Sequence, residues 1–143
     1  MSSDRNKDTV RRIYEALETG DGSVFARSVH PHYVWRVAGQ ASWSGTFEGH
    51  EAIRDKLLRP LYSRFAGTYT ARATNIIGEG DWVVAEVRGD VELKGSGRYD
   101  NSYCFLFRFE DGLIAEVVEY GDTDLEERVL GPYDAALRAV EAG

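Results

Sequence analysis

The chain has 143 residues, of which 43% are hydrophobic and 29% are charged, and its formal net charge at pH 7 is −7. This length predicts one globular domain, residues 1–143, that buries roughly two-thirds of the surface of its unfolded form. The negative charge argues against nucleic acid or an anionic membrane as a partner. No segment has the about 20 consecutive apolar residues of a membrane span, and residues 1–8 are too polar for an export signal, so we expect a cytoplasmic protein.

Cys104 is the only cysteine, which excludes disulfides within the chain and metal sites built from several cysteines. His30 and His32 flank a proline and have no acidic residue or cysteine close to them in sequence, so no metal site is predicted there. Aromatic residues make up 12% of the chain, with 3 Trp, 8 Tyr and 6 Phe. This is more than a small core requires, and we expect some of these rings to line a ligand pocket.

The first half of the sequence predicts helices. Val10, Ile13, Tyr14 and Leu17 follow the i, i+3, i+4, i+7 spacing of an amphipathic helix, which we expect over residues 4–18. The elements expected after it are a short helix over residues 23–29 that Pro31 ends, a strand over 33–37, a loop over 38–49 and a third helix over 50–62. The loop is rich in Gly and Ser and shows neither helical nor strand periodicity.

The second half predicts a sheet followed by a short helical end. Four runs rich in Val, Tyr, Phe and Thr are separated by turns that contain Gly, and they cover residues 69–77, 82–93, 99–109 and 113–120. Such runs are typical of antiparallel meander strands. The sequence Thr123-Asp124-Leu125-Glu126 has the spacing of a capping box that starts a helix, interrupted at Gly131-Pro132 and resumed over 133–140.

Helices followed by a meander predict an α+β fold. We expect a strongly curved, mixed or antiparallel sheet wrapped around three N-terminal helices, with a short C-terminal helix. Strands of about ten residues favour strong curvature. The sheet would then form a cone whose mouth stays open as a pocket.

Strand alternation divides the residues of the 99–109 run between two faces. The face expected to point inward contains Tyr99, Asn101, Tyr103, Phe105, Phe107 and Phe109. In the 113–120 run, one face contains Ala115, Val117 and Glu119, and the other contains Ile114, Glu116, Val118 and Tyr120. Hydrophobicity alone does not decide which of these two faces points inward.

Several short segments spread over nearly the whole chain form a recognisable set. They are Ile13-Tyr14-Glu15-Ala16-Leu17, Tyr33-Val34-Trp35, Gly45-Thr46-Phe47-Glu48-Gly49-His50, Tyr99-Asp100-Asn101-Ser102-Tyr103 and Glu119-Tyr120-Gly121-Asp122. Together they resemble the nuclear-transport-factor-two-like superfamily, especially its SnoaL-like, ketosteroid-isomerase-like and limonene-epoxide-hydrolase-like branches. This superfamily contains enzymes, ligand-binding modules and transport adaptors, so the fold does not determine the function.

The resemblance implies roles for three candidate catalytic residues. The hydrolase branch has a water-activating carboxylate one residue before the tyrosine of the last strand, which corresponds to Glu119. Burial would raise the pKa of Glu119 toward the range of a general base, with Asn101 or Tyr103 orienting the carboxylate. The isomerase branch has a tyrosine in the place of Tyr14, whose hydroxyl donates a hydrogen bond to an enolate oxygen. The alternatives are a hydrated or ion-paired Glu119 at the cone mouth and a Tyr14 that serves only the core.

Two departures from these branches argue against ketosteroid isomerisation itself. The strand that begins at Tyr33 carries no acidic residue to act as a base, and Phe105 stands where the isomerase branch has its second acid. The charged pair of the hydrolase branch falls near Glu86 and Arg88 in reversed order. Their strand face is predicted to point outward, so we do not assign them to the site.

Position 35 or position 36 contributes to the pocket, depending on the alignment. Trp35 faces inward in the hydrolase-like alignment and Arg36 in the isomerase-like one. We favour Trp35, since a buried aromatic ring needs no charged partner. The complete set of predicted substrate-binding residues is Trp35, Tyr99, Tyr103, Phe105, Phe107 and Val117.

These features predict a small-molecule enzyme that uses no cofactor and no metal. The expected chemistry is proton transfer, in an isomerisation, a cyclisation or a water addition, on a hydrophobic oxygenated ligand, with Glu119 as base and Tyr14 and Asn101 as hydrogen-bonding groups. A non-catalytic ligand-binding or dimerisation module of the same fold is the alternative, and a protein-partner adaptor ranks third. Because Cys104 and Leu106 are predicted to lie on the outer sheet face, we expect a homodimer through that face.

Overall fold

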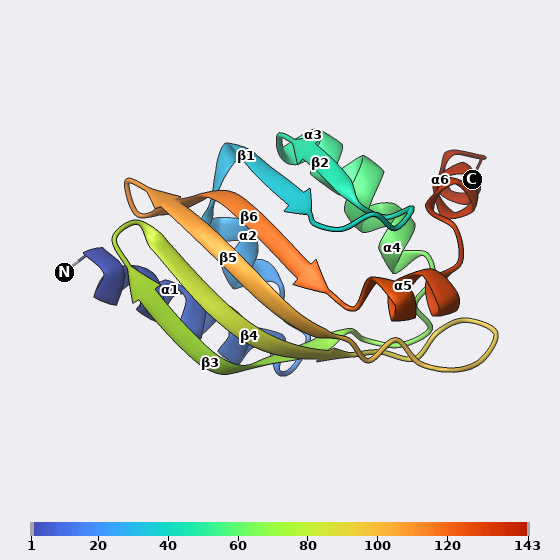
Figure 1. Cartoon of the computed structure of the whole chain (residues 1–143), viewed down its shortest axis with the longest axis horizontal. Coiled ribbons are helices and arrows are strands. Elements are labelled where there is room, and N and C mark those ends of the chain that lie inside the picture. The colour runs from blue at the N-terminus through green and yellow to red at the C-terminus, as the bar shows by residue number, and fades with distance from the viewer. Residues whose placement is uncertain (1, 143) are drawn as a thin grey trace.

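One six-stranded sheet organises the chain, with the strand order β2-β1-β6-β5-β4-β3 (Figure 1). The computed structural model describes residues 2–142, so Met1 and Gly143, the two ends of the predicted domain, lie outside the described residues. All neighbouring strands are antiparallel except β1 and β6, which run parallel. The predicted α+β fold with a mixed sheet is confirmed.

The helices come first and last in the sequence, and the long strands lie between them. The elements are α1 (Ser2–Leu17), α2 (Ser23–Arg27), β1 (Val29–Val37), β2 (Gly45–Glu48), α3 (His50–Ala52), a π-helical segment (Ile53–Leu58), α4 (Arg59–Tyr62), β3 (Thr70–Glu79), β4 (Trp82–Asp90), β5 (Ser102–Glu110), β6 (Leu113–Gly121), α5 (Thr123–Leu130) and α6 (Tyr133–Ala142). Within the described part of the chain, no helix is long and apolar enough to cross a membrane.

Helix α1 packs against β3 and β4, on the face of the sheet that lies behind the strands in Figure 1. Its apolar stripe is buried as predicted, with Val10 at 0% and Ile13 at 1% exposure. Burial of such a stripe stabilises a helix far more than intrinsic propensity does. This helix therefore closes the concave side of the sheet.

The predicted boundary between α2 and the first strand is wrong. Helix α2 ends at Arg27, and β1 begins at Val29 and runs through Pro31. Proline lacks an N–H and is tolerated in a strand only where regular pairing is interrupted. The pairing of β1 with β6 shifts register between Val29 and Val34, which provides such an interruption.

Strand β2 was not predicted, because its residues lie within the expected loop over 38–49. It is an edge strand paired only with β1, and its residues are exposed apart from the half-buried Phe47. Because only one side chain of this strand is buried, its sequence does not show the alternation of apolar and polar residues from which strands are predicted.

The third predicted helix forms over residues 50–62, with an unexpected π-helical segment in the middle. The N–H of Arg59 donates to the carbonyl of Arg54, five residues back. Pro60 follows directly and has no N–H to offer a helical bond, so a locally widened turn accommodates it.

The hairpin between β4 and β5 is regular over a shorter range than predicted. Beyond Asp90 the two segments of the hairpin are joined only by individual hydrogen bonds. In one of them, the N–H of Tyr99 donates to the carbonyl of Val91 at 2.9 Å. The Asp100 side chain accepts from the N–H of Val91 at 3.2 Å. This side-chain contact replaces a ladder bond and ends the regular strands.

The cap of α5 is one residue earlier than the predicted capping box. Asp122 is the N-cap, and its carboxylate accepts from the N–H of Leu125 at 3.1 Å. Aspartate and threonine are both good N-cap residues, so the sequence Asp122-Thr123 left two possible starts.

A β-bulge in β6 changes which residues point inward. Phe109 pairs with Ile114, but Arg108 pairs with Glu116, so Ala115 is the extra residue. Ile114 consequently joins Val117 in the main core, which contradicts the predicted face shared by Ala115, Val117 and Glu119. Beyond the bulge the alternation is regular, and Val117 and Glu119 do share the inner face.

The interior consists of two hydrophobic clusters. The larger lies between α1 and the sheet and contains Phe105 and Phe107. The smaller lies at the other end, where Trp43 packs edge-on against Tyr133 of α6 and donates from Nε1 to the Gly131 carbonyl at 2.8 Å. The second cluster attaches α5 and α6 to the open end of the sheet.

The bulge at Ala115 leads to a prediction about stability. Ile114→Ala should lower the free energy of unfolding by about 2–5 kcal/mol, because Ile114 is fully buried and truncation leaves a cavity. Thr74→Ala is the control, because Thr74 is exposed on the edge strand β3, and it should change stability by no more than about 0.5 kcal/mol. Denaturant unfolding monitored by circular dichroism measures both variants. Equal effects would show that Ile114 lies on the outer face.

Candidate active site

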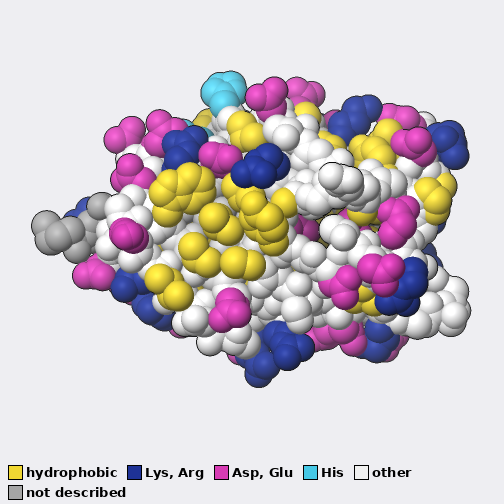
Figure 2. All heavy atoms as spheres, in the orientation of Figure 1, with side chains coloured by type: hydrophobic (Ala, Val, Ile, Leu, Met, Phe, Trp, Pro, Cys, Tyr) yellow, Lys and Arg dark blue, Asp and Glu magenta, His cyan; other side chains and the backbone are white. Residues whose placement is uncertain are grey.

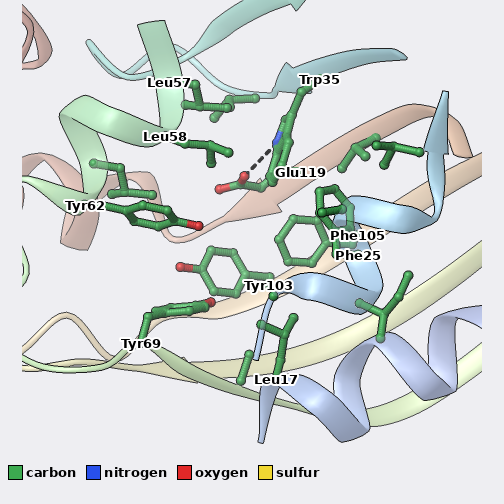
Figure 3. Close-up of a pocket in the computed structure, with 18 of the residues that line it drawn as sticks. Leu17, Phe25, Trp35, Leu57, Leu58, Tyr62, Tyr69, Tyr103, Phe105 and Glu119 are labelled. Atoms are coloured by element: carbon green, nitrogen blue, oxygen red, sulfur yellow. Dashed lines mark hydrogen bonds between the residues drawn. The ribbon is translucent and has the colours of Figure 1, made fainter. Parts of the chain in front are cut away.

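A cavity of about 350 Å³ lies between the concave face of the sheet and the helices (Figure 3). Side chains from α1, α2, the 50–62 helix, β1, β5, β6 and α5 line it, and most are aromatic or aliphatic. The volume is at the lower end of the about 300–1,000 Å³ found for small-molecule sites. The cavity therefore suits a compact, mostly apolar ligand.

Glu119 is the charged group at the centre of this cavity. Its carboxylate lies among aromatic rings in Figure 3, and Oε1 accepts a hydrogen bond from Nε1 of Trp35 at 3.0 Å. Glu119 is half-buried, and it lines the cavity together with Trp35. The predicted alternative of an ion-paired Glu119 is not observed, because none of its contacts within residues 2–142 is to a cation.

Desolvation dominates the electrostatics of Glu119. Removal from water and, to a smaller extent, the carboxylate of Glu126 raise its pKa, the Trp35 hydrogen bond lowers it, and the result is a pKa of about 7. A carboxyl group with a pKa near 7 is ionised in an appreciable fraction of molecules at neutral pH and remains basic enough to accept a proton. This is the property that a general base requires.

The structure resolves the choice between Trp35 and Arg36. Trp35 lines the cavity, and Arg36 is exposed on the outer face of the sheet. The rings of Phe25 and Phe105 contact Trp35 edge-on, with centroid distances of 5.8 Å and 6.3 Å. These contacts hold the indole so that its N–H reaches Glu119.

Several tyrosines surround the carboxylate. Tyr14, Tyr99 and Tyr103 were predicted to face the cavity and do so, and Tyr62 and Tyr69 line it as well. Figure 3 shows Tyr62, Tyr69 and Tyr103 converging on the space beside Glu119. Burial raises the pKa of Tyr14 and Tyr103 well above the usual value for a phenol. Their hydroxyls therefore stay protonated and are available as hydrogen-bond donors.

The sequence offered weak signals for Tyr62 and Tyr69. Tyr62 is the last residue of the third predicted helix, and Tyr69 is the first residue of a predicted strand. Positions at element ends are not covered by periodicity, because a single residue can point to either side there.

Asn101 is buried at 2% exposure, but it does not belong to the cavity wall. Its Oδ1 accepts from the N–H groups of Ser102 and Asp122 at 2.8 Å and 3.2 Å. Its Nδ2 donates to the hydroxyl of Tyr99 at 3.0 Å and to the Asp122 carbonyl at 3.4 Å. The amide is thus directed to Tyr99 and the start of α5, and not to Glu119 as expected.

Glu126 is a second carboxyl group on the cavity wall that the sequence did not reveal as a site residue. It is 5% exposed, and the hydroxyl of Tyr99 donates to its Oε2 at 3.4 Å. Desolvation raises its pKa, the Tyr99 hydrogen bond opposes this rise, the neighbouring Glu127 adds to it, and the result is a pKa of about 7. In the sequence, Glu126 was interpreted as part of a capping box at the start of a helix, and for this reason its position on the cavity wall was not predicted.

The remaining predicted contacts divide as follows. Phe105, Phe107 and Val117 line the cavity as expected. Glu86 and Arg88 are exposed on the outer face of β4, which confirms that they lie outside the site. In the described chain, no group of three or more His, Cys, Asp or Glu side chains could hold a metal ion.

The curved sheet, the helices on its concave face and the cavity between them are features of the nuclear-transport-factor-two-like fold. The family of SnoaL-like domains matches residues 10–117, and the chain belongs to that family. Both carboxylates, Glu119 and Glu126, lie beyond the matched segment. None of the curated proteins matches the chain.

Three solved structures illustrate the likeness. Bal32a from a soil-derived mobile gene cassette is 25% identical, covering 91% of this chain and 99% of its own, with a TM-score of 0.77. A proposed SnoaL-like polyketide cyclase from Jannaschia sp. CCS1 is 19% identical, covering 91% and 94%, with a TM-score of 0.72. TerC, co-crystallised with polyporic acid, is 19% identical, covering 88% and 98%, with a TM-score of 0.73. At 19% identity, the similarity to the last two structures shows a shared fold alone.

The raised pKa values of Glu119 and Glu126 predict an unusual pH dependence of stability. Both carboxyls have a higher pKa when folded than when unfolded, so their stabilising effect is complete below about pH 4.5 and is lost as the pH rises to about 7. The loss should be at most about 3 kcal/mol for each group.

Glu119→Gln should remove the contribution of Glu119 and make the unfolding free energy less dependent on pH between about 5 and 8. Denaturant unfolding across this range gives the measurement. Glu116→Gln is the matched control, because Glu116 is on the same strand but pairs with Arg108 on the outer face. A wild-type stability that rises with pH over this range would contradict the desolvation of Glu119.

Proposed function

We propose that the protein is a cofactor-independent enzyme that transfers a proton on a hydrophobic, oxygenated small molecule bound in the cavity. The observation that carries this proposal is Glu119, a desolvated carboxylate with a single N–H donor inside an apolar cavity. Such a group is costly to bury and does little for folding. The names of two fold relatives, a proposed polyketide cyclase and a protein crystallised with polyporic acid, support a ligand of this kind.

The proposed step is the removal of a proton from a carbon next to a carbonyl group. The Glu119 carboxylate takes the proton, the C–H electron pair forms the enolate, and the negative charge develops on the carbonyl oxygen. Tyr103, Tyr69 and Tyr14 are hydroxyl donors available to that oxygen. In a β,γ-unsaturated carbonyl compound, return of the proton from Glu119 to the γ-carbon gives an isomerisation. Attack of the enolate carbon on a second carbonyl, whose oxygen then takes the proton back from Glu119, gives a cyclisation.

Trp35 is assigned the role of holding the base. Its N–H bonds to Oε1, so it fixes the carboxylate while Oε2 has no hydrogen-bond partner within residues 2–142. A neutral N–H donor lowers the pKa of Glu119 only partly, in contrast to a cation, which would suppress its basicity. This arrangement favours proton transfer over simple structural support.

The proposal is tested by the exchange of acidic C–H protons in a ketone probe. We expect the wild-type protein to catalyse deuterium incorporation into 2-tetralone in D₂O, followed by ¹H NMR. Glu119→Gln preserves the shape and removes the base, so the rate should fall by about 100-fold or more. The wild-type rate should rise with pH through an apparent pKa of about 7, because the carboxylate is the active form.

Glu116→Gln serves again as the matched control and should leave the exchange rate unchanged. Retention of the wild-type rate and pH profile in Glu119→Gln would remove Glu119 from the mechanism. Binding of 2-tetralone without any catalysed exchange would favour the alternative function, a non-catalytic ligand-binding module.

We also propose that the protein is a homodimer through the outer face of the sheet. Three apolar side chains cross this face in register, Ile77, Val84 and Leu106, and the next residue in the row, Val118, is already buried within the chain at 2% exposure. Figure 2 shows hydrophobic side chains gathered on the face that the strands present to the viewer in Figure 1. Tyr120, 49% exposed, lies on the same face. A contiguous apolar area of this kind is rarely left open to water.

Leu106→Glu should dissociate this dimer, because it introduces a charge in the middle of the apolar row. Light scattering at micromolar concentration is expected to give the dimer mass for the wild type and the monomer mass for the variant. Thr74→Glu, at an exposed position of the edge strand β3, is the control and should remain dimeric. A monomeric wild type would contradict the proposal.

A further inference from the structure

Glu126 is the most enclosed acidic group in the described chain, and the proposed proton transfer does not use it. It lies on α5 with 5% exposure and forms part of the cavity wall. Its Oε2 accepts from Tyr99, but Oε1 is buried without a hydrogen-bond partner among the described residues. An unsatisfied buried oxygen on a cavity wall is costly and calls for a functional explanation.

A chain of hydrogen bonds fixes the direction of the Tyr99–Glu126 contact. Two backbone N–H groups point at Oδ1 of Asn101, which sets the orientation of its amide so that Nδ2 faces Tyr99. Because Nδ2 can only donate, the Tyr99 oxygen accepts there and directs its own proton to Oε2 of Glu126. Oε2 is therefore an acceptor, and in the neutral carboxyl group the proton resides on Oε1.

We propose that Glu126 is a ligand-binding residue that donates a hydrogen bond from Oε1 to an oxygen atom of the ligand. Asn101 and Tyr99 act as positioning residues, because they fix which oxygen carries the proton. Desolvation favours the neutral form of Glu126, the hydrogen bond from Tyr99 opposes it, and the nearby carboxylate of Glu127 acts in the same direction as desolvation.

Two polar groups on one apolar cavity define the class of ligand. Glu119 on β6 and Glu126 on α5 both line the cavity, and the other lining residues are mainly aromatic and aliphatic. A ligand that satisfies both is an apolar ring compound with two oxygen substituents. This inference rests on the proposed function in one respect, namely that the cavity binds a hydrophobic oxygenated molecule.

The test compares three probes that differ only in oxygen content: naphthalene, 2-naphthol and 2,6-dihydroxynaphthalene. Binding is measured by isothermal titration calorimetry at about pH 6, below the pKa of about 7 for Glu126. We expect the dihydroxy probe to bind the wild type about tenfold more tightly than 2-naphthol, the usual effect of one well-placed hydrogen bond.

Two substitutions separate donor from acceptor. In Glu126→Gln the amide nitrogen replaces Oε1 as a donor while the amide oxygen still accepts from Tyr99, so the tenfold preference should remain. In Glu126→Leu no donor is left, and the two probes should bind with equal affinity. Asp124→Asn, at an exposed position of the same helix, is the control for charge and should keep the preference.

Several results would overturn the proposal. These are a failure of the dihydroxy probe to bind, an unchanged preference in Glu126→Leu, and a loss of the preference in Glu126→Gln, which would make Glu126 a charged acceptor. Because affinities are compared within each variant, general effects of a substitution on the cavity cancel. Deuterium exchange into 2-tetralone by the wild type and by Glu119→Gln reports separately on Glu119, so failure of one proposal is distinguishable from failure of the other.

Discussion

The hydrogen bond between Trp35 and Glu119 is the interaction on which the arrangement of the site depends. It joins β1 to β6, the only parallel pair in the sheet, and the register of that pair sets Trp35 beside Val117 and Val37 beside Glu119. Residues two apart on one strand share a face, so the indole and the carboxylate meet diagonally on the concave side. A carboxylate in an apolar cavity without this donor would lack any compensation for its lost hydration.

The rest of the structure supports this contact from two directions. On one side, Phe25 of α2 and Phe105 of β5 contact the indole ring and restrict its rotation. On the other, the bulge at Ala115 lets β6 bury Ile114 and Val117 on the same face while Glu119 still points inward. Helix α2 and the bulge therefore contribute to the position of the Glu119 carboxylate although neither carries a polar group of the cavity.

Sequence periodicity predicts which face of a helix or strand is buried, and it limited which parts of this structure could be predicted. The alternation of β5 and the helical spacing of Val10 and Ile13 are enforced by burial, so their inward faces were predicted correctly. The bulge in β6 and the exposed edge strand β2 were not, because one inserted residue or one buried side chain leaves no repeating pattern. Glu126 was not predicted as a site residue for another reason. The capping-box pattern already accounted for a glutamate at the start of this helix, so nothing suggested that its side chain lines the cavity.

The two carboxyl groups give the cavity a charge that varies within the physiological range of pH. With pKa values of about 7 for both Glu119 and Glu126, the apolar chamber is nearly uncharged in mildly acidic solution and gains negative charge above neutrality. An anionic guest such as a phenolate is repelled strongly in a low-dielectric enclosure, whereas a neutral phenol is not. In alkaline solution the charge of the chamber therefore disfavours anionic compounds, in addition to the limits that its size and apolar walls impose.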